Sequence, residues 1–174
     1  NNFSDVAAEI AADEVAAVLR LCEQRGQRVH IAGANTGLVG ASNPDRTGEQ
    51  VVLSLERLNR IRSIDAAGRT ATVEAGVTLG TLNQALEPHG LCFPIDLGAD
   101  PQIGGMIATN TGGSRLLSCG DVRHNLLGLE VVLPDGERWS KLSGLRKDNT
   151  GLDWKQLFVG TSGAFGVITA AVLE

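Results

Sequence analysis

The sequence lacks tyrosine, contains only 3% aromatic residues and carries no basic excess, since its formal net charge is −5. Nucleic acids and anionic membrane surfaces both require a positively charged footprint, so neither is expected as a partner. No apolar run approaches the ~18 residues that a membrane-spanning helix needs. The composition, with 43% hydrophobic and 20% charged residues, is typical of a globular protein without a membrane-spanning segment.

Cysteine is also scarce. Cys22, Cys92 and Cys119 are odd in number and widely spaced, and they match no zinc or redox spacing. The three histidines form no H-x-x-H pattern, so no metal site is expected. No basic and apolar leader opens the chain. Reduced thiols without an export leader favour a cytoplasmic location.

Glycine, by contrast, is abundant, with 22 in 174 residues against a usual share of about 7%. The glycines gather in three clusters, at 33–40, 98–113 and 160–166. A folded chain places glycine where the backbone turns tightly or approaches something closely. Three clusters in one small domain indicate a large ligand contacted by several loops. A turn-rich protein with a glycine at each bend is the alternative.

Hydrophobic periodicity predicts an α+β fold. Asp13 can cap a helix with an apolar face at Val15, Leu19 and Cys22, which Gly26 ends. A second helix is expected from Thr78 to Pro88, and a short one at 153–158. Strands are predicted at 29–32, 51–54, 61–65, 70–75, 126–133, 137–140 and 167–173. This order favours two lobes, a small mixed α/β lobe followed by a larger, mainly antiparallel α+β lobe.

The segment 33–42, Gly-Ala-Asn-Thr-Gly-Leu-Val-Gly-Ala-Ser, follows the first predicted strand. Successive small residues let backbone N–H groups turn inward and form a nest for an anion such as a diphosphate. A Walker loop is excluded because no Gly-Lys-Ser/Thr is present, and the glycine spacing does not fit G-x-G-x-x-G. A purely structural turn is the alternative for this segment taken alone.

Longer phrases carry a resemblance. Residues 93–100 (FPIDLGAD), 103–113 (IGGMIATNTGG), 126–136 and 145–158 are similar, in this order, to the vanillyl-alcohol-oxidase/PCMH-type FAD-binding superfamily. Within it, the chain most resembles the branch of D-2-hydroxyglutarate dehydrogenase, D-lactate dehydrogenase and the FAD subunit of glycolate oxidase. The resemblance extends from about Asp13 to Glu174. It therefore implies that residues 1–174 are a PCMH-type FAD-binding domain.

The resemblance also implies which residues contact FAD. The pyrophosphate segment corresponds to Gly33, Ala34, Asn35, Thr36 and Gly37, with Ala41 and Ser42. Residues that line the cofactor correspond to Pro94, Asp96, Leu97 and Gly98, followed by Gly104, Gly105, Thr109, Asn110, Gly112 and Gly113. The strand beside the cofactor corresponds to Gly166, Val167 and Ile168. Apolar cover is expected from Leu38, Val39, Met106 and Ile107.

Some positions depart from the family pattern. Ser162 stands where relatives often carry glutamate, Cys119 replaces a common aromatic residue and Leu152 a frequent tyrosine. The loop between Ala99 and Ile103 is shorter than in many relatives. Some members attach the flavin to a histidine in the pyrophosphate loop, but this loop has none. FAD is therefore expected to bind non-covalently.

The activity implied by the resemblance is that of an FAD-dependent oxidoreductase, with hydride transfer from the α-carbon of a 2-hydroxy acid to the flavin. In this branch the base and the carboxylate-binding arginines come from a C-terminal substrate domain, of the same or another chain. We therefore expect no catalytic residue in 1–174, and FAD binding without turnover. Two alternatives remain: a non-catalytic FAD-carrier subunit, and a domain that keeps the fold but has lost FAD. The departure at Ser162 favours the latter, and the intact loop 33–42 argues against it.

Overall fold

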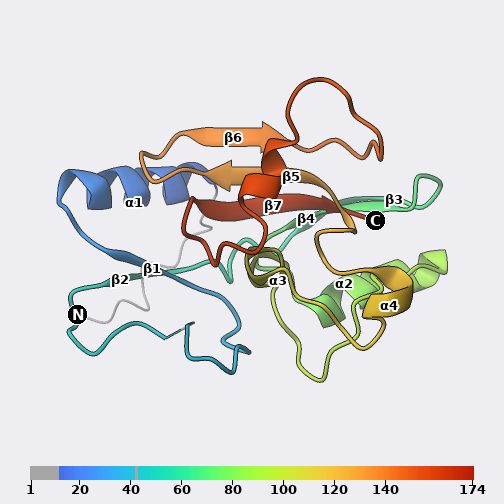
Figure 1. Ribbon diagram of the computed structural model, residues 1–174, viewed down its shortest axis with the longest axis horizontal. Coiled ribbons are helices and arrows are strands. Elements are labelled where there is room, and N and C mark those ends of the chain that lie inside the picture. Colours follow the sequence, from blue (N-terminus) through green and yellow to red (C-terminus); the bar gives the residue numbers. More distant parts are fainter. Residues whose placement is uncertain (1–11, 42) are drawn as a thin grey trace.

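A computed structural model describes residues 12–41 and 43–174 and shows two sheets flanked by helices (Figure 1). Strands β1 (Val29–Ala32) and β2 (Val51–Ser54) form a two-stranded parallel sheet. A five-stranded antiparallel sheet follows in the order β3-β4-β7-β5-β6. Its strands are β3 (Ile61–Asp65), β4 (Thr70–Glu74), β5 (Leu126–Val132), β6 (Arg138–Lys141) and β7 (Val167–Leu173). The expected α+β fold with a small mixed lobe and a larger antiparallel lobe is confirmed.

The helices are α1 (Ala12–Gln24), α2 (Leu79–Leu86), α3 (Ile103–Thr109) and α4 (Leu116–Cys119), with short 3₁₀ turns at Glu87–His89 and Trp154–Leu157. The predicted start of the first helix needs correction, because Asp13 lies within the first turn of α1 and not at its N-cap. Its predicted end is confirmed. Gly26 has a φ of +60°, and Gln27 N–H bonds the carbonyl of Cys22, as at a glycine-terminated helix.

Helix α3 is absent from the sequence prediction. Its sequence, Ile-Gly-Gly-Met-Ile-Ala-Thr, contains two glycines, which disfavour a helix by about 1 kcal/mol each. The first turn forms because its N–H groups find partners outside the helix: Ile103 bonds Val77 O and Gly104 bonds Ala75 O, both at 2.8 Å. Met106 and Ile107 are at most 1% exposed and fix the helix to the core. Tertiary contacts therefore override local propensity here.

The core lies beneath the centre of the large sheet. Every residue of β7, the central strand, is buried, and β5 beside it is buried at all but one position. Helix α1 packs beside β5 through its apolar face, and Arg20 donates to the carbonyl of Gly136 at 2.9 Å. Helix α3 packs against β7 and β4, between the large sheet and the β1 segment (Figure 1). No helix of the described residues is both long and apolar enough to cross a bilayer.

A buried ionic network joins four strands of the large sheet. Glu74 on β4, 1% exposed, accepts hydrogen bonds from the side chains of Arg60 and Arg62 at 3.0–3.3 Å. Arg62 continues to Glu130 on β5 at 3.3 Å, and Thr169 on β7 donates to Glu130 at 2.9 Å. Burial alone would raise the pKa of Glu74, but the bonds from Arg60 and Arg62 hold it below its usual 4.5.

Candidate functional site

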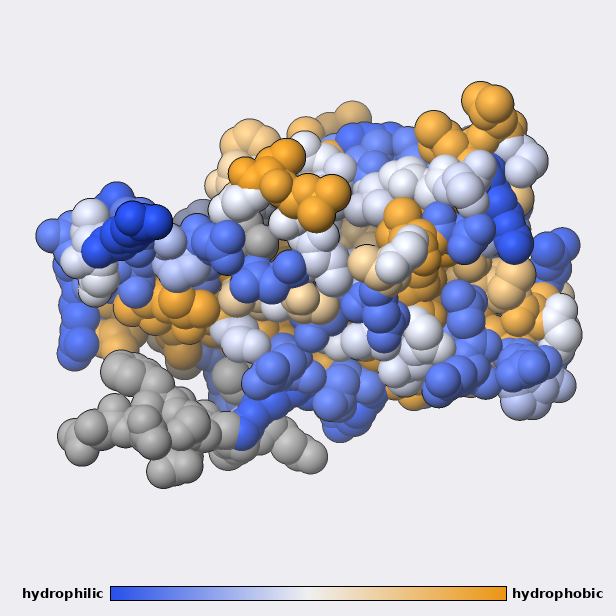
Figure 2. Space-filling model, turned by 90° about the horizontal axis from the view of Figure 1, so that it is seen from below, coloured by the Kyte–Doolittle hydropathy of each residue, from blue (hydrophilic) through white to orange (hydrophobic). Residues whose placement is uncertain are grey.

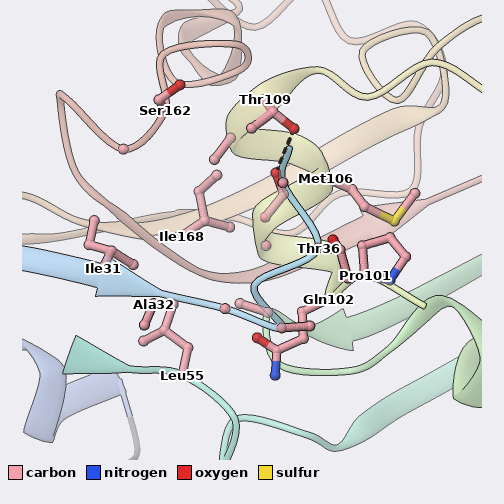
Figure 3. A pocket seen from close by; sticks show the side chains of 18 of the residues that line it. Ile31, Ala32, Thr36, Leu55, Pro101, Gln102, Met106, Thr109, Ser162 and Ile168 are labelled. Atoms are coloured by element: carbon pink, nitrogen blue, oxygen red, sulfur yellow. Dashed lines mark hydrogen bonds between the residues drawn. The ribbon is translucent and has the colours of Figure 1, made fainter. Parts of the chain in front are cut away.

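A cavity of about 370 Å³ opens between β1 with its following loop, α3 and the start of β7 (Figure 3). This volume lies within the range of small-molecule sites. The predicted residues that line it are Gly33, Ala34, Asn35, Thr36, Gly37, Ala41, Gly104, Gly105, Thr109, Gly166 and Ile168. All three glycine clusters therefore meet at one cavity, although they are far apart in the sequence.

The loop 33–41 forms one wall of the cavity and is largely exposed. Asn35 has a φ of +57° and Gly40 a φ of +75°, so the backbone reverses its handedness twice within the loop. Asn35 Nδ2 lies 3.4 Å from Asn43 Oδ1 across the loop. Left-handed residues within a run of small residues are a feature of backbone concavities that bind anions.

Two adjacent glycines of α3 serve different purposes. A methyl group at Gly104 would lie 2.7 Å from the Cβ of Ala75, so glycine is required there for α3 to reach the end of β4. A methyl group at Gly105 would meet nothing within 4 Å, and Gly105 borders the cavity. Gly104 thus permits close packing within the protein, whereas Gly105 leaves space for a ligand.

The cavity has no charged side chain among its lining residues in the described chain. An anionic group would therefore be held by backbone N–H dipoles and neutral donors. Thr36 contributes one hydroxyl, whereas the hydroxyl of Thr109 donates its single proton to Gly105 O at 2.9 Å, lies 2.8 Å from the hydroxyl of Thr111 and is left to accept from a ligand. This wall suits a diphosphate, whose charge oriented amides can meet.

Gln102 is a cavity residue that sequence reasoning missed. It is 8% exposed as a residue and borders the cavity, and its amide, which makes no hydrogen bond to a described residue, is not among the fully enclosed side-chain groups. Its Oε1 lies 3.2 Å from where a Cβ on Gly33 would stand, which places it against the glycine loop (Figure 3). The amide is therefore available to donate to or accept from a ligand in the cavity. Its position directly before Ile103-Gly104-Gly105 was the available signal.

Ser162, Gly163 and several apolar residues were also not predicted as cavity residues. Ser162 borders the cavity with a φ of +54°, and its N–H bonds Ala108 O at 2.7 Å. The apolar lining residues that were not predicted are Ile31, Ala32, Leu55, Ala75, Pro101 and Ala108. Met106 and Val39 thus lie where apolar cover was expected, whereas Ile107 is 0% exposed and belongs to the core.

Some predicted residues do not border the cavity. Pro94, Leu97, Gly98 and Gly112 lie outside its lining, as do Asp96 and Gly113, which pack against each other. A methyl group at Gly113 would lie 2.5 Å from Asp96 O, and Ser114 Oγ donates to Asp96 Oδ2 at 2.7 Å. The segments 94–98 and 112–114 are thus two loops bonded to each other. They follow on from Thr111, which does line the cavity.

Three further predicted residues have other positions. Val167 is 2% exposed within β7, and Asn110 bonds neighbouring protein groups at the end of α3. Leu38 is fully exposed. The surface seen in Figure 2 carries several separate hydrophobic groups among polar ones. Ser42 lies outside the described residues. No cluster of three potential metal-ligating His, Cys, Asp or Glu side chains occurs in the described ranges.

The comparisons with known sequences define the class of the protein. A sequence family described as an FAD binding domain matches residues 9–140. The chain therefore belongs to this family of FAD-binding domains, and FAD is its cofactor. The cavity fits that cofactor, since small residues, neutral donors and a nest-forming loop line it.

The relatives with the most detailed names are dehydrogenases and a transhydrogenase. The chain is 46% identical over 159 residues to mitochondrial D-2-hydroxyglutarate dehydrogenase of Bos taurus, covering 90% of this chain and 29% of the relative. It is 43% identical to the D-2-hydroxyglutarate–pyruvate transhydrogenase of Saccharomyces cerevisiae (90% and 32% covered). It is 45% identical to a putative mitochondrial D-lactate dehydrogenase of Schizosaccharomyces pombe (90% and 30% covered). The chain thus spans less than a third of these proteins.

A solved structure of alkyldihydroxyacetonephosphate synthase shares the fold, with a TM-score of 0.80 and 23% identity over 92% of this chain and 29% of that one. The expected cytoplasmic location is wrong, because the relatives from Bos taurus, Danio rerio and Schizosaccharomyces pombe are named as mitochondrial. Cysteine content reports on the redox state of a compartment, and several compartments keep thiols reduced.

Proposed function

We propose that this chain is the FAD-binding part of a flavin-dependent dehydrogenase that acts on a 2-hydroxy acid. The single observation that carries the proposal is the uncharged cavity on which three glycine clusters converge. The relatives named for D-2-hydroxyglutarate and D-lactate support the substrate class. When bound, the flavin supplies the capacity to accept hydride from the hydroxyl-bearing carbon, while the protein orients it.

The residues of the chain divide the task of holding FAD. Backbone N–H groups of loop 33–37 and the neutral side chains of Thr36 and Gln102 would hold the diphosphate. Thr109, Thr111 and Ser162 would add polar contacts, and Met106 and Ile168 an apolar surface. Non-covalent attachment is proposed, because the described lining contains neither histidine nor cysteine.

The substrate machinery is proposed to lie in a C-terminal domain, of this or another chain. A base for the substrate hydroxyl must come within about 3 Å of its proton. No titratable side chain lines the cavity in the described residues. We therefore expect the 174-residue chain to hold FAD as one domain without oxidising a hydroxy acid by itself.

The test is a titration of the 174-residue chain with FAD, followed by visible absorbance and by flavin fluorescence. Gly37→Trp should abolish binding by filling the loop nest, and Gln102→Glu should weaken it by placing a carboxylate beside the diphosphate. Ala67→Trp, in the exposed β3–β4 turn, is the matched control and should bind like the unmodified chain. Absence of saturable binding to a folded chain would refute the proposal. Bleaching of the bound flavin by D-lactate or D-2-hydroxyglutarate would refute the claim that the substrate machinery lies elsewhere.

A further inference from the structure

Three segments meet behind the polar wall of the cavity. They are the end of α3 with residues 110–111, the loop 120–125 and the segment 156–163. The first contributes Thr109 and Thr111 to the cavity, and the third contributes Ser162 and Gly163. The loop 120–125 contributes no lining residue within the described chain, yet it bonds to both of the others.

Asn110 links the first segment to this loop. It sits between the two threonines with a φ of +50°, a left-handed conformation that asparagine tolerates better than most residues. Its Nδ2 donates to Asp121 Oδ2 at 2.9 Å, and its Oδ1 accepts the N–H of Arg123 at 3.0 Å. Both ends of the amide are thus engaged with protein groups, and Asn110 does not line the cavity. Its influence on a ligand must pass through the threonines on either side.

Arg123 links the loop to the third segment. Its two terminal nitrogens donate to Gln156 Oε1 at 2.6 Å and to the carbonyl of Val159 at 2.7 Å. Directly after Val159, Gly160 N–H bonds Ile107 O and Ser162 N–H bonds Ala108 O. The guanidinium fork therefore fixes the start of the turn that presents Ser162 and Gly163. A planar fork holds two acceptors in a defined geometry that a lysine cannot reproduce.

From these contacts, and resting on the proposed function, we infer that Asn110 and Arg123 are positioning residues for FAD. Together they set the separation of the Thr109–Thr111 wall from the Ser162–Gly163 wall without contacting the cofactor. A site whose contact residues are held in place by hydrogen-bonded neighbours binds its ligand more tightly than a site on mobile loops. The reason is that less conformational entropy of the protein is lost on binding. The direct contact that the family resemblance implies for Asn110 is thereby replaced by an indirect one.

The test compares Arg123→Met and Arg123→Lys with Arg138→Met, which removes an exposed ion pair between β6 and Asp13 of α1, outside the cavity lining. The Kd for FAD of each variant is measured well below its melting temperature. Arg123→Met should raise the Kd for FAD about tenfold, the low end of what loss of a supporting partner costs at metal sites, and should reduce the fine structure of the bound flavin band. Arg123→Lys should not restore binding, because the charge remains but the fork is lost. Arg138→Met should bind normally.

Coupling separates positioning from general destabilisation. If Arg123 acts on FAD through the Thr109–Thr111 wall, the effects should not add. The double variant Arg123→Met/Thr111→Val should then have the same Kd for FAD as whichever single variant binds FAD more weakly. Multiplying effects, or a folded Arg123→Met chain with unchanged Kd and band shape, would overturn the inference. Failure of the unmodified chain to bind FAD would instead refute the proposed function, so the two failures are distinguishable.

Discussion

The large sheet and the cavity loops differ in whether their polar groups find hydrogen-bond partners within the protein. In the sheet, even a buried carboxylate such as Glu74 is surrounded by donors, and the network continues through Arg62 and Glu130. Beside the cavity, the residues of the loop 33–41 are exposed, and Gln102 borders the cavity without a side-chain hydrogen bond to a described residue. The sheet is complete without a ligand, whereas the cavity wall is completed by one.

This difference assigns separate tasks to the two regions. Stability is not uniform across a structure, and segments with few buried contacts open more readily than core strands. Changes in the sheet network should therefore alter the free energy of unfolding and leave cofactor affinity intact. Changes in the cavity wall should do the reverse. If the two regions are as separate as their bonding indicates, a variant in one changes its own property and leaves the other unchanged.

The largest effect is expected for Glu74→Ala. Removing one partner from a buried ionic network leaves the remaining charges without a counter-ion. This loss typically lowers the free energy of unfolding by 3–5 kcal/mol. Because Arg60 is largely exposed and can turn to water, we expect about 3 kcal/mol. Urea unfolding gives the free energy, and FAD titration should show an unchanged Kd for the folded fraction.

Glu56→Ala is the matched control for this variant. Glu56 is exposed at the surface, so its loss should change the free energy of unfolding by less than about 0.5 kcal/mol. An equal loss in both variants would show that net charge, and not the network, sets stability. A higher Kd for FAD in Glu74→Ala would show that the sheet and the cavity are coupled.

The adjacent glycines of α3 sharpen the comparison within one turn of helix. Gly104→Ala forces a methyl group into contact with Ala75 and should destabilise the fold by about 2 kcal/mol. Gly105→Ala meets no neighbour, so it should stabilise α3 by about 0.5–1 kcal/mol while occupying ligand space and raising the Kd for FAD. Thermal melts and FAD titration of both variants test the two signs. Two destabilised variants with equal Kd would show that Gly105 is needed only for folding.

The sequence predicted the sheet well and the cavity only in part. Alternation and turn chemistry located strands such as 167–173, because each strand carries its own hydrophobic pattern. The glycine clusters and the family phrases located the loop 33–41 and Gly105. Gln102 and Ser162 escaped prediction, because their roles arise from segments that only the tertiary fold brings together. The family resemblance implied a contact for Asn110, whereas the structure places this residue outside the cavity lining, and the left-handed backbone there was not visible in the sequence.

Acid should affect the sheet through Glu74. Hydrogen bonds from Arg60 and Arg62 hold the pKa of Glu74 below its usual 4.5 in the folded state. The group therefore stabilises the fold at pH values above 4.5, and this contribution is lost as the pH falls through the folded-state pKa. Urea unfolding between pH 7 and pH 3 should show a steeper loss for the unmodified chain than for Glu74→Gln, which cannot titrate there. Parallel profiles would mean that other carboxylates, such as Asp121, account for the acid sensitivity.

The smallest effect is expected at two residues with the same strained backbone. Ser162 and Arg69 both have a φ of +54°, which disfavours a side chain, so Ser162→Gly and Arg69→Gly should each stabilise the fold by about 0.5 kcal/mol after the entropy cost of glycine. Arg69 lies in the β3–β4 turn, whereas Ser162 borders the cavity. Calorimetry should therefore give matched shifts, while isothermal titration with FAD should show weaker binding only for Ser162→Gly, because only that change removes a cavity hydroxyl. Equal Kd values for both variants would show that the strained serine supports the turn alone, and that the cavity wall binds FAD without this hydroxyl.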